Sequence, residues 1–131
     1  MLFQKRPPRP VRVTHELRSR KEELKDASGR TLVIVNLIYP SLSGKTPLAS
    51  RFNDFYQKTA DAYYAFAEDD LRTIAEKNPD RPPCGAVLKA AVTAEDDETL
   101  TVTLDASVYD GQSRLTPFHD ERRWDKRTGL F

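Results

Sequence analysis

The residues best suited to acid–base chemistry in this chain are its two histidines. His119 is followed by Asp120 and Glu121, and a histidine beside an orienting carboxylate is the pairing that general acid–base catalysis uses. Adjacent residues of a strand point to opposite faces, however, so His119 and Asp120 would not meet easily. His15 lies on the apolar side of an expected strand, where a structural role is the simpler interpretation. The two histidines are not closely spaced, so we expect no zinc site.

Three further motifs look reactive but are better explained structurally. Cys84 is the single cysteine, which excludes an internal disulfide and a C-x-x-C metal or redox motif. The acidic run at 95–98 lacks the turn glycine of a calcium loop, so we expect a solvated hairpin tip. Residues 44–46 read Gly-Lys-Thr, like the end of a phosphate loop, but the upstream glycine of that motif would fall at Tyr39. We therefore expect neither a metal nor a cofactor.

A separate group of residues is typical of binding surfaces rather than of catalysis. Tyr, Trp and Arg dominate the energetic hot spots of protein interfaces, and they gather here between residues 109 and 124. The predicted contact surface consists of Tyr109, Arg114, His119, Arg122 and Trp124. For Trp124, a place in the core is an equally good interpretation.

Length and composition indicate one compact domain. The chain has 131 residues and a formal net charge of +1, so no global field marks it as a binder of nucleic acid. Its longest apolar run, residues 32–39, is far shorter than the ~20 residues that cross a bilayer. The amino terminus lacks the ~7–15-residue apolar stretch of a signal peptide. We expect a cytoplasmic protein without a membrane segment.

The amino-terminal part predicts an arm followed by strands. Residues 1–9 are basic and proline-rich and should form a flexible arm before a single domain at 10–131. From Pro10 onward apolar and polar residues alternate, which predicts a half-buried strand with His15 and Leu17 on its apolar side. Next, the segment from Thr31 to Tyr39 is apolar on both faces, which predicts a central strand that is covered on each side. It should end there, because the proline that follows cannot donate to a ladder.

A long helix is expected between Thr46 and Asn78. Thr46 suits the N-cap, and Pro47 suits the first helical position. Apolar side chains then recur at helical spacing and form one stripe that should lie on the sheet. A break is expected near residues 68–70. The stripe comprises Leu48, Phe52, Phe55, Tyr56, Thr59, Tyr63, Phe66 and Ile74.

The carboxyl-terminal part predicts three more strands. Strands at 86–94 and 99–109 should form a hairpin around the acidic turn, and the second has one clean apolar face from Leu100 to Val108. A last strand at 115–124 should be interrupted near Pro117. The element order β-β-α-β-β-β predicts an α+β fold, a two-layer sandwich of one mostly antiparallel, four- to five-stranded sheet with the long helix packed on one face.

Several segments together resemble the RsiV-like family. These are Tyr-Pro-Ser-Leu-Ser-Gly at 39–44, Asn53 within the helix, and Trp-Asp-Lys-Arg-Thr-Gly at 124–129. That family includes the lysozyme-sensing outer domain of a bacterial anti-sigma factor and a domain of unknown function beside some polysaccharide deacetylases. The resemblance implies a binding role without catalysis. The family usually has Tyr-x-Gly-Gly-Ala-His where this chain has Tyr-Asp-Gly-Gln-Ser-Arg at 109–114, so lysozyme recognition is not carried over.

The sequence thus favours a non-enzymatic binding domain. Its partner should be another protein or a saccharide, contacted through residues 109–124 or the polar face of the sheet. One alternative is a small hydrolase or glycan-processing accessory that uses His119 with a carboxylate. Another is a self-associating structural protein, a homodimer formed through edge strands or through the polar face of the second hairpin strand. That polar face carries Thr101, Thr103, Ser107 and Tyr109.

Overall fold

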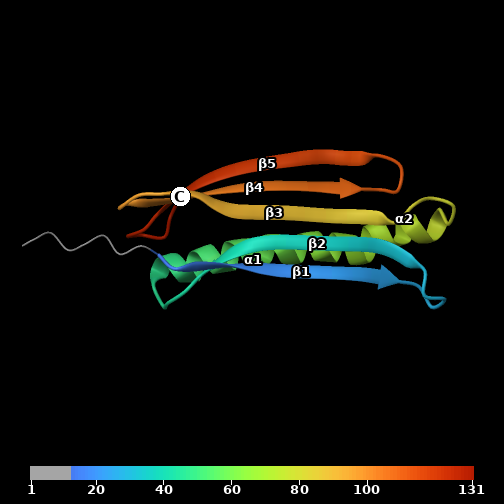
Figure 1. The fold of residues 1–131 in the computed structure, drawn as a ribbon, viewed down its shortest axis with the longest axis horizontal. Coiled ribbons are helices and arrows are strands. Elements are labelled where there is room, and N and C mark those ends of the chain that lie inside the picture. The colour runs from blue at the N-terminus through green and yellow to red at the C-terminus, as the bar shows by residue number, and fades with distance from the viewer. Residues whose placement is uncertain (1–12) are drawn as a thin grey trace, which may run out of the picture.

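The fold is a five-stranded sheet with a long helix across one of its faces (Figure 1). The computed structural model describes residues 13–131, so the predicted arm at 1–9 lies outside the described residues. The strand order is β1-β2-β3-β4-β5, with β2 and β3 parallel and the other neighbours antiparallel. This is the predicted α+β two-layer sandwich. The elements are β1 (His15–Lys25), β2 (Thr31–Leu42), α1 (Pro47–Phe66), a π-helical segment (Ala67–Leu71), α2 (Arg72–Lys77), β3 (Cys84–Glu95), β4 (Thr99–Tyr109) and β5 (Arg114–Asp125).

The helical layer begins and breaks where the sequence predicts. The hydroxyl oxygen of Thr46 caps α1 by accepting the N–H of Ala49 at 3.0 Å. The predicted break near 68–70 is the π-helical segment, which joins α1 to α2 without ending the helix. A π-helical turn inserts an extra residue into the helical repeat. Buried residues continue on the sheet side beyond it, at Leu71 and Ala75.

The core lies between the helix and one face of the sheet. The aromatic stripe enters this core at Phe52 and Tyr56, which are 0% and 1% exposed. Farther along the helix the buried residues are mostly alanines, which allow the backbone to lie close to the sheet. Phe66, a predicted member of the stripe, is instead 37% exposed. The sheet contributes the buried residues Val33, Val35, Leu37, Ala86, Leu88, Ala90, Leu100, Val102, Leu104, Ala106 and Trp124.

The edge strand β1 is less buried than its alternation predicts. Leu17 is 61% exposed, because the side that carries His15 and Leu17 belongs to the face of the sheet opposite the helix. The helix side of β1 is held by polar contacts with α1 instead. Arg20 stacks 3.4 Å from the centre of the Tyr64 ring, and the Tyr64 hydroxyl donates to Glu22 at 2.7 Å. Polar contacts of this kind produce no periodic pattern of apolar residues, so the sequence does not reveal which side of β1 faces the helix.

The central strand β2 differs from prediction in two respects. Its face opposite the helix is covered only in part, since Ile34 on that face is 46% exposed although Leu42 near the strand end is 4% exposed. It also continues through Pro40 to Leu42 instead of ending at Tyr39. Pairing with β3 has already ended at Ile38, so Pro40 has a strand neighbour on one side only. A proline is tolerated in such a position because no ladder on the open side needs its N–H.

The remaining strands confirm the predicted hairpin and the predicted interruption. β3 and β4 pair around the acidic turn, where Asp96 Oδ1 accepts the N–H groups of Glu98 and Thr99 at 2.8 and 2.7 Å. The register between β4 and β5 shifts between Ala106 and Val108. This irregularity lies opposite the segment of β5 that contains Pro117, where the sequence predicts a break.

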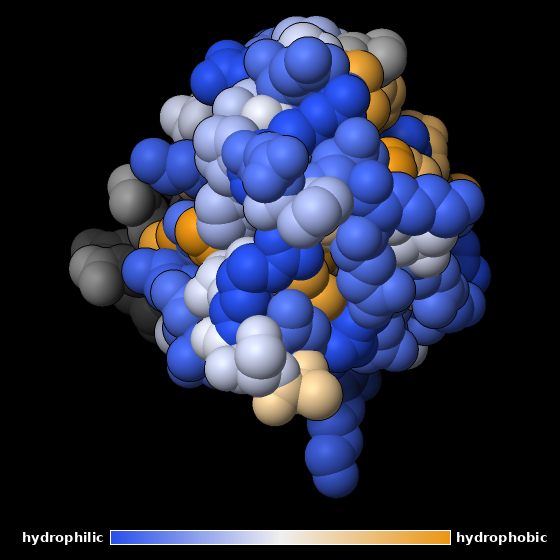
Figure 2. Space-filling view, turned by 90° about the vertical axis from the view of Figure 1, so that its right-hand side faces the viewer, coloured by the Kyte–Doolittle hydropathy of each residue, from blue (hydrophilic) through white to orange (hydrophobic). Residues whose placement is uncertain are grey.

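The end of the molecule that carries α2 and the β1–β2 turn presents a largely hydrophilic surface (Figure 2). Asp26 closes that turn, because its Oδ1 accepts the N–H groups of Ser28 and Arg30 at 2.9 and 3.0 Å. The Ser28 hydroxyl also donates to Asp26, and these hydrogen bonds lower the pKa of Asp26 to about 2. Of the helices that the structure describes, none combines the length and the apolar character needed to span a membrane.

Candidate functional site

Within residues 13–131, no helix covers the face of the sheet opposite α1 (Figure 1). We call it the open face. Strand register decides which side chains it presents, since every second residue of each strand points to it. Three rows cross the sheet in register. They read Glu23, Ile34, Gly85, Tyr109 and Arg114; Lys21, Asn36, Val87 and Ser107; and Ser19, Ile38, Lys89, Asp105 and His119.

Three apolar side chains form a patch on the open face. Ile34 and Tyr109 lie on either side of Gly85, and Val87 lies two residues farther along β3. Ile34, Val87 and Tyr109 are 46%, 43% and 37% exposed. Gly85 has no side chain to fill the space between its neighbours, and a Cβ there would lie 3.7 Å from the Cβ of Tyr109. We call Ile34, Val87 and Tyr109 the apolar patch.

The structure divides the five predicted contact residues between the two faces of the sheet. Tyr109, Arg114 and His119 lie on the open face. Trp124 lies on the helix side, 1% exposed, and its ring centre is 5.3 Å from that of Phe52. Of the two interpretations that the sequence allows for Trp124, the structure therefore shows the core residue.

Arg122 also belongs to the helix side and is engaged within the protein. Its Nε donates to Asp120 Oδ2 at 2.9 Å. Its guanidinium lies 4.3 Å from the ring centre of Phe55 and 4.2 Å from that of Phe131. Arg122 and Trp124 share the face of β5 that points at α1. Arg122 therefore stacks within the protein and does not lie on the same face as Tyr109, Arg114 and His119.

His119 has a carboxylate partner, but it is not the neighbouring one. His119 Nδ1 lies 2.6 Å from Asp105 Oδ1 across the β4–β5 ladder. Asp120 faces the other side of the sheet, as the alternation of strand residues predicts. The hydrogen bond to Asp105, followed by its charge, raises the pKa of His119. Both side chains are exposed, 61% for His119 and 67% for Asp105, so solvent screens this pair.

One polar group on the open-face side of β2 is buried without a hydrogen-bond partner among residues 13–131. Asn36 Oδ1 is buried and accepts no hydrogen bond from any residue that the structure describes. Asn36 lies between Lys21 of β1 and Val87 of β3 in the register. A buried acceptor without a donor lowers stability, so this position is not optimised for the fold.

The helical asparagine of the family resemblance joins β2 to α1. Asn53 Oδ1 accepts the N–H of Leu42 at 2.8 Å, and Asn53 Nδ2 donates to the Leu42 carbonyl at 2.9 Å. The Ser41 hydroxyl donates to the same Oδ1 at 3.4 Å. Nearby, the Tyr39 hydroxyl donates to Gln57 Oε1 at 3.0 Å. The segment at 39–44 and Asn53 therefore hold the strand to the helix.

The terminal motif at 124–129 is likewise structural. Asp125 Oδ1 accepts the N–H groups of Thr128 and Arg127 at 2.9 and 2.8 Å, and these hydrogen bonds lower the pKa of Asp125. Gly129 has a φ of +71°, and a Cβ there would lie 2.9 Å from the carbonyl oxygen of Pro47. Only glycine fits this turn without displacing the start of α1.

The two other motifs singled out in the sequence supply structural side chains. Cys84 is buried, and desolvation raises the pKa of its thiol, which disfavours the reactive thiolate. Asp96 is engaged within the hairpin turn, as described above. Within residues 13–131 no three His, Cys, Asp or Glu side chains come close enough to hold a metal ion.

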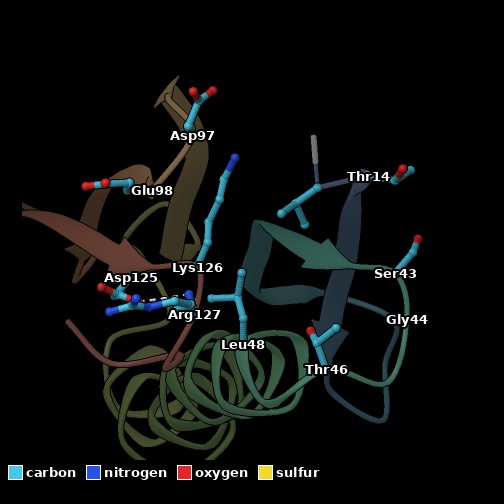
Figure 3. Close-up of a pocket in the computed structure, with 11 residues that line it drawn as sticks. Thr14, Ser43, Gly44, Thr46, Leu48, Asp97, Glu98, Asp125, Lys126 and Arg127 are labelled. Carbon is cyan, nitrogen blue, oxygen red and sulfur yellow. Dashed lines mark hydrogen bonds between the residues drawn. The ribbon is translucent and has the colours of Figure 1, made fainter. Parts of the chain in front are cut away.

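A cavity of about 580 Å³ opens at the end of the sandwich opposite α2 (Figure 3). Leu48 and Lys126 line it, with the β2–α1 loop and the β3–β4 turn around its mouth. Lys126 Nζ lies 2.7 Å from Glu95 Oε2, which also accepts the N–H of Val13 at 3.0 Å. The charged lining mixes Asp97, Glu98 and Asp125 with Lys126 and Arg127. That mixture specifies no single class of ligand.

No family model matches the chain, and no curated protein matches it. Its fold is similar to that of a DUF3298 family member from Bacteroides fragilis, with a TM-score of 0.55, 11% identity and coverage of 88% of this chain and 56% of that one. It is also similar to a DUF3298 family protein from Pseudomonas aeruginosa, with a TM-score of 0.52, 14% identity and coverage of 89% and 53%. The chain spans about half the length of these solved structures. At such low identity the likeness establishes a shared fold.

Proposed function

We propose that this chain is a non-catalytic, protein-binding domain that docks its partner on the open face of the sheet. The apolar patch is the observation that carries the proposal, since Ile34, Val87 and Tyr109 are exposed together on that face, toward the end of the sheet where β3 begins and β4 ends. A sheet face that only meets water is usually polar along its strands. A contiguous exposed apolar patch with polar margins is typical of an interaction site.

The charges around the apolar patch specify the kind of partner. Lys21, Lys89 and Arg114 flank it on three strands, and the one carboxylate directly beside Ile34, that of Glu23, is paired with Lys25 at 3.7 Å. Of the nearby carboxylates, Asp105 already binds His119. A protein surface with an apolar centre and an acidic margin would cover the patch and pair with the flanking cations. Binding should then weaken and slow as salt is raised, because rim charges act mainly through steering.

The test is a titration with a purified partner. Affinity capture with the wild-type chain supplies candidates, and each candidate is expressed, purified and titrated by calorimetry. Val87→Glu places a charge in the centre of the apolar patch, and we expect it to weaken binding at least about tenfold. Phe118→Glu is the matched control, because Phe118 is 49% exposed but lies on the helix side of β5.

Both variants replace exposed side chains, so their thermal unfolding should stay close to wild type. Equal affinity of wild type and Val87→Glu would contradict the proposal, as would equal loss in both variants. A failure of every purified candidate to bind would contradict it as well.

The His119–Asp105 pair favours a second candidate, the small hydrolase or glycan-processing accessory. A histidine held by a carboxylate is a general-base arrangement, here with Asp105 in place of the neighbouring Asp120. The high exposure of both side chains argues for a surface pair instead. Turnover of a model ester or acetylated glycan that His119→Ala abolishes would favour the hydrolase over the binding domain.

Self-association through the same face is the remaining alternative. Sedimentation at several concentrations distinguishes it, because a dimer would dissociate on dilution and a monomeric binder would not change. If the protein forms a concentration-dependent dimer and Val87→Glu abolishes it, the partner on the open face is a second copy of the chain and not an acidic protein.

Kinship with the RsiV-like family and a cytoplasmic location are parts of the proposal that rest on sequence alone. The shared motifs include Asn53 and Gly129, whose contacts hold the helix to the sheet and to the terminal turn. These motifs support the same packing of helix on sheet as in that family, and with it a binding role. The kind of partner is inferred from the open face of this chain.

A further inference from the structure

We infer a second binding site, for a small oxyanion, in a polar groove on the helix side of the molecule. The groove has a volume of about 470 Å³ and lies between α1 and the adjoining ends of β1 and β2. It is separated from the open face by the sheet itself. We call it the polar groove, and its lining includes Arg18, Arg51, Tyr39, Ser41, Asn53 and Gln57.

Two arginines from different elements line the polar groove. Arg18 extends from β1, opposite Tyr39 in the register, and Arg51 extends from the amino-terminal half of α1. Neither guanidinium makes a hydrogen bond or ion pair to a residue that the structure describes, whereas Arg20, the next helix-side residue of β1, contacts Glu22 at 3.4 Å and Asp61 at 3.9 Å. The cations at the groove are thus left available for a ligand.

The floor of the groove supplies polar groups that are already positioned. Tyr39 and Ser41 are 7% and 6% exposed, and their hydroxyls are oriented by Gln57 and Asn53 at 3.0 and 3.4 Å. Asn53 is in turn fixed by its two hydrogen bonds to Leu42. A ligand would therefore meet a preorganised polar floor, which lowers the entropy lost on binding.

The charge balance of the groove favours an anion. Asp54 is the acidic residue of the lining, and Lys58 neutralises it through an ion pair of 3.0 Å. Arg18 and Arg51 then leave a positive excess.

The chemistry of these groups selects a carboxylate or phosphoryl group on a small polar molecule. Guanidinium forks match the two oxygens of either group in bidentate fashion. A volume of about 470 Å³ is within the range of small-ligand sites and larger than a bare ion requires. The hydroxyl hydrogens of Tyr39 and Ser41 are donated to Gln57 and Asn53, so their oxygens can accept from hydroxyl groups on the body of the ligand.

The experiment is an NMR titration of the full chain with three probes. Citrate represents the carboxylate source, inorganic phosphate represents the phosphoryl source, and glycerol is the uncharged control. We expect one of the two anions to give saturable shifts of the Ser41, Asn53 and Arg51 amides, and glycerol to give none. The anion that saturates at lower concentration identifies the group that the site takes.

Substitutions decide whether the two arginines form the site. Arg18→Gln and Arg51→Gln should each weaken binding of the better anion at least about tenfold, as the loss of a charged hydrogen bond predicts. Arg123→Gln is the matched control, because Arg123 is an exposed arginine on the opposite face. All three variants should keep the wild-type melting temperature. The inference is overturned if neither anion saturates, if shifts scatter over the surface, or if Arg123→Gln weakens binding as much as the groove variants.

Discussion

Trp124 donates its indole N–H to the hydroxyl oxygen of Tyr56 at 3.1 Å, across 68 positions of the chain. Both side chains are 1% exposed. This hydrogen bond joins the last strand of the sheet to the middle of α1, and burial raises the pKa of Tyr56 to about 12. The contact fixes β5 beneath the helix, and β5 in turn presents His119 and Arg114 on the open face.

Tyr56→Phe should destabilise the protein by about 1–3 kcal/mol, because it leaves the buried indole N–H of Trp124 without an acceptor. Urea denaturation measures the change in the free energy of unfolding. Tyr63→Phe on the same helix is the control, since the Tyr63 hydroxyl bonds to no residue in the described part of the chain, and it should change stability by less than about 0.5 kcal/mol. Equal losses would show that the hydrogen bond contributes nothing.

Gly129→Ala should cost more stability than Gly29→Ala, although both glycines have positive φ, +71° and +88°. At Gly29 a Cβ meets nothing within 4 Å, so only left-handed backbone strain of about 1–2 kcal/mol is expected. At Gly129 the Cβ would lie 2.9 Å from Leu48 Cα and from the Pro47 carbonyl, which adds about 1–3 kcal/mol of overpacking. Thermal unfolding of both variants tests the difference, and a Gly129→Ala protein as stable as Gly29→Ala would refute the close contact.

The His119 titration should depend on Asp105 far more than on Asp120. The hydrogen bond that His119 donates to Asp105 holds the pKa of His119 above its ordinary value near 6.5. The contribution of the His119–Asp105 pair to stability is therefore complete below pH 6.5 and is lost as the pH rises through the pKa of His119 in the folded state. Proton NMR of His119 should show a pKa that falls in Asp105→Asn and changes little in Asp120→Asn. A larger effect of Asp120→Asn would mean that the cross-strand pair does not form.

Asn36→Leu should stabilise the protein by about 1 kcal/mol, because it removes a buried acceptor that has no donor. Asn53→Leu is the opposite case. It removes both hydrogen bonds to Leu42 and should cost about 1–3 kcal/mol. Urea denaturation of the two variants gives the signs directly, and a destabilised Asn36→Leu would show that the amide has a partner in solution.

Local patterns predicted most of the elements. The Thr46 cap, the aromatic stripe through Phe52 and Tyr56, and the alternation of β4 each follow from short-range chemistry, and all three hold in the structure. The errors concern where β2 ends and which face of a strand is covered, as at Leu17 and Ile34. Coverage depends on where a single helix lies across five strands, which no segment of sequence encodes by itself.

The site was predictable only in part for the same reason. Tyr109, Arg114 and His119 lie together on one face, whereas Trp124 and Arg122 lie on the other. Alternate residues of a strand face opposite sides, so the sequence of β5 already implies that Arg122 and Trp124 lie on the other side from His119. The partnership of His119 with Asp105 depends on the β4–β5 register, which is shifted beside Pro117 and so cannot be counted from the sequence.

Site-specific photo-crosslinking tests the central claim most directly. A benzoylphenylalanine placed at Val87, in the apolar patch, should form a covalent adduct with the purified partner in a one-to-one complex. The same probe at Phe118, equally accessible but on the helix side, should form none. An adduct from Phe118 without one from Val87 would contradict the assignment of the open face as the docking surface.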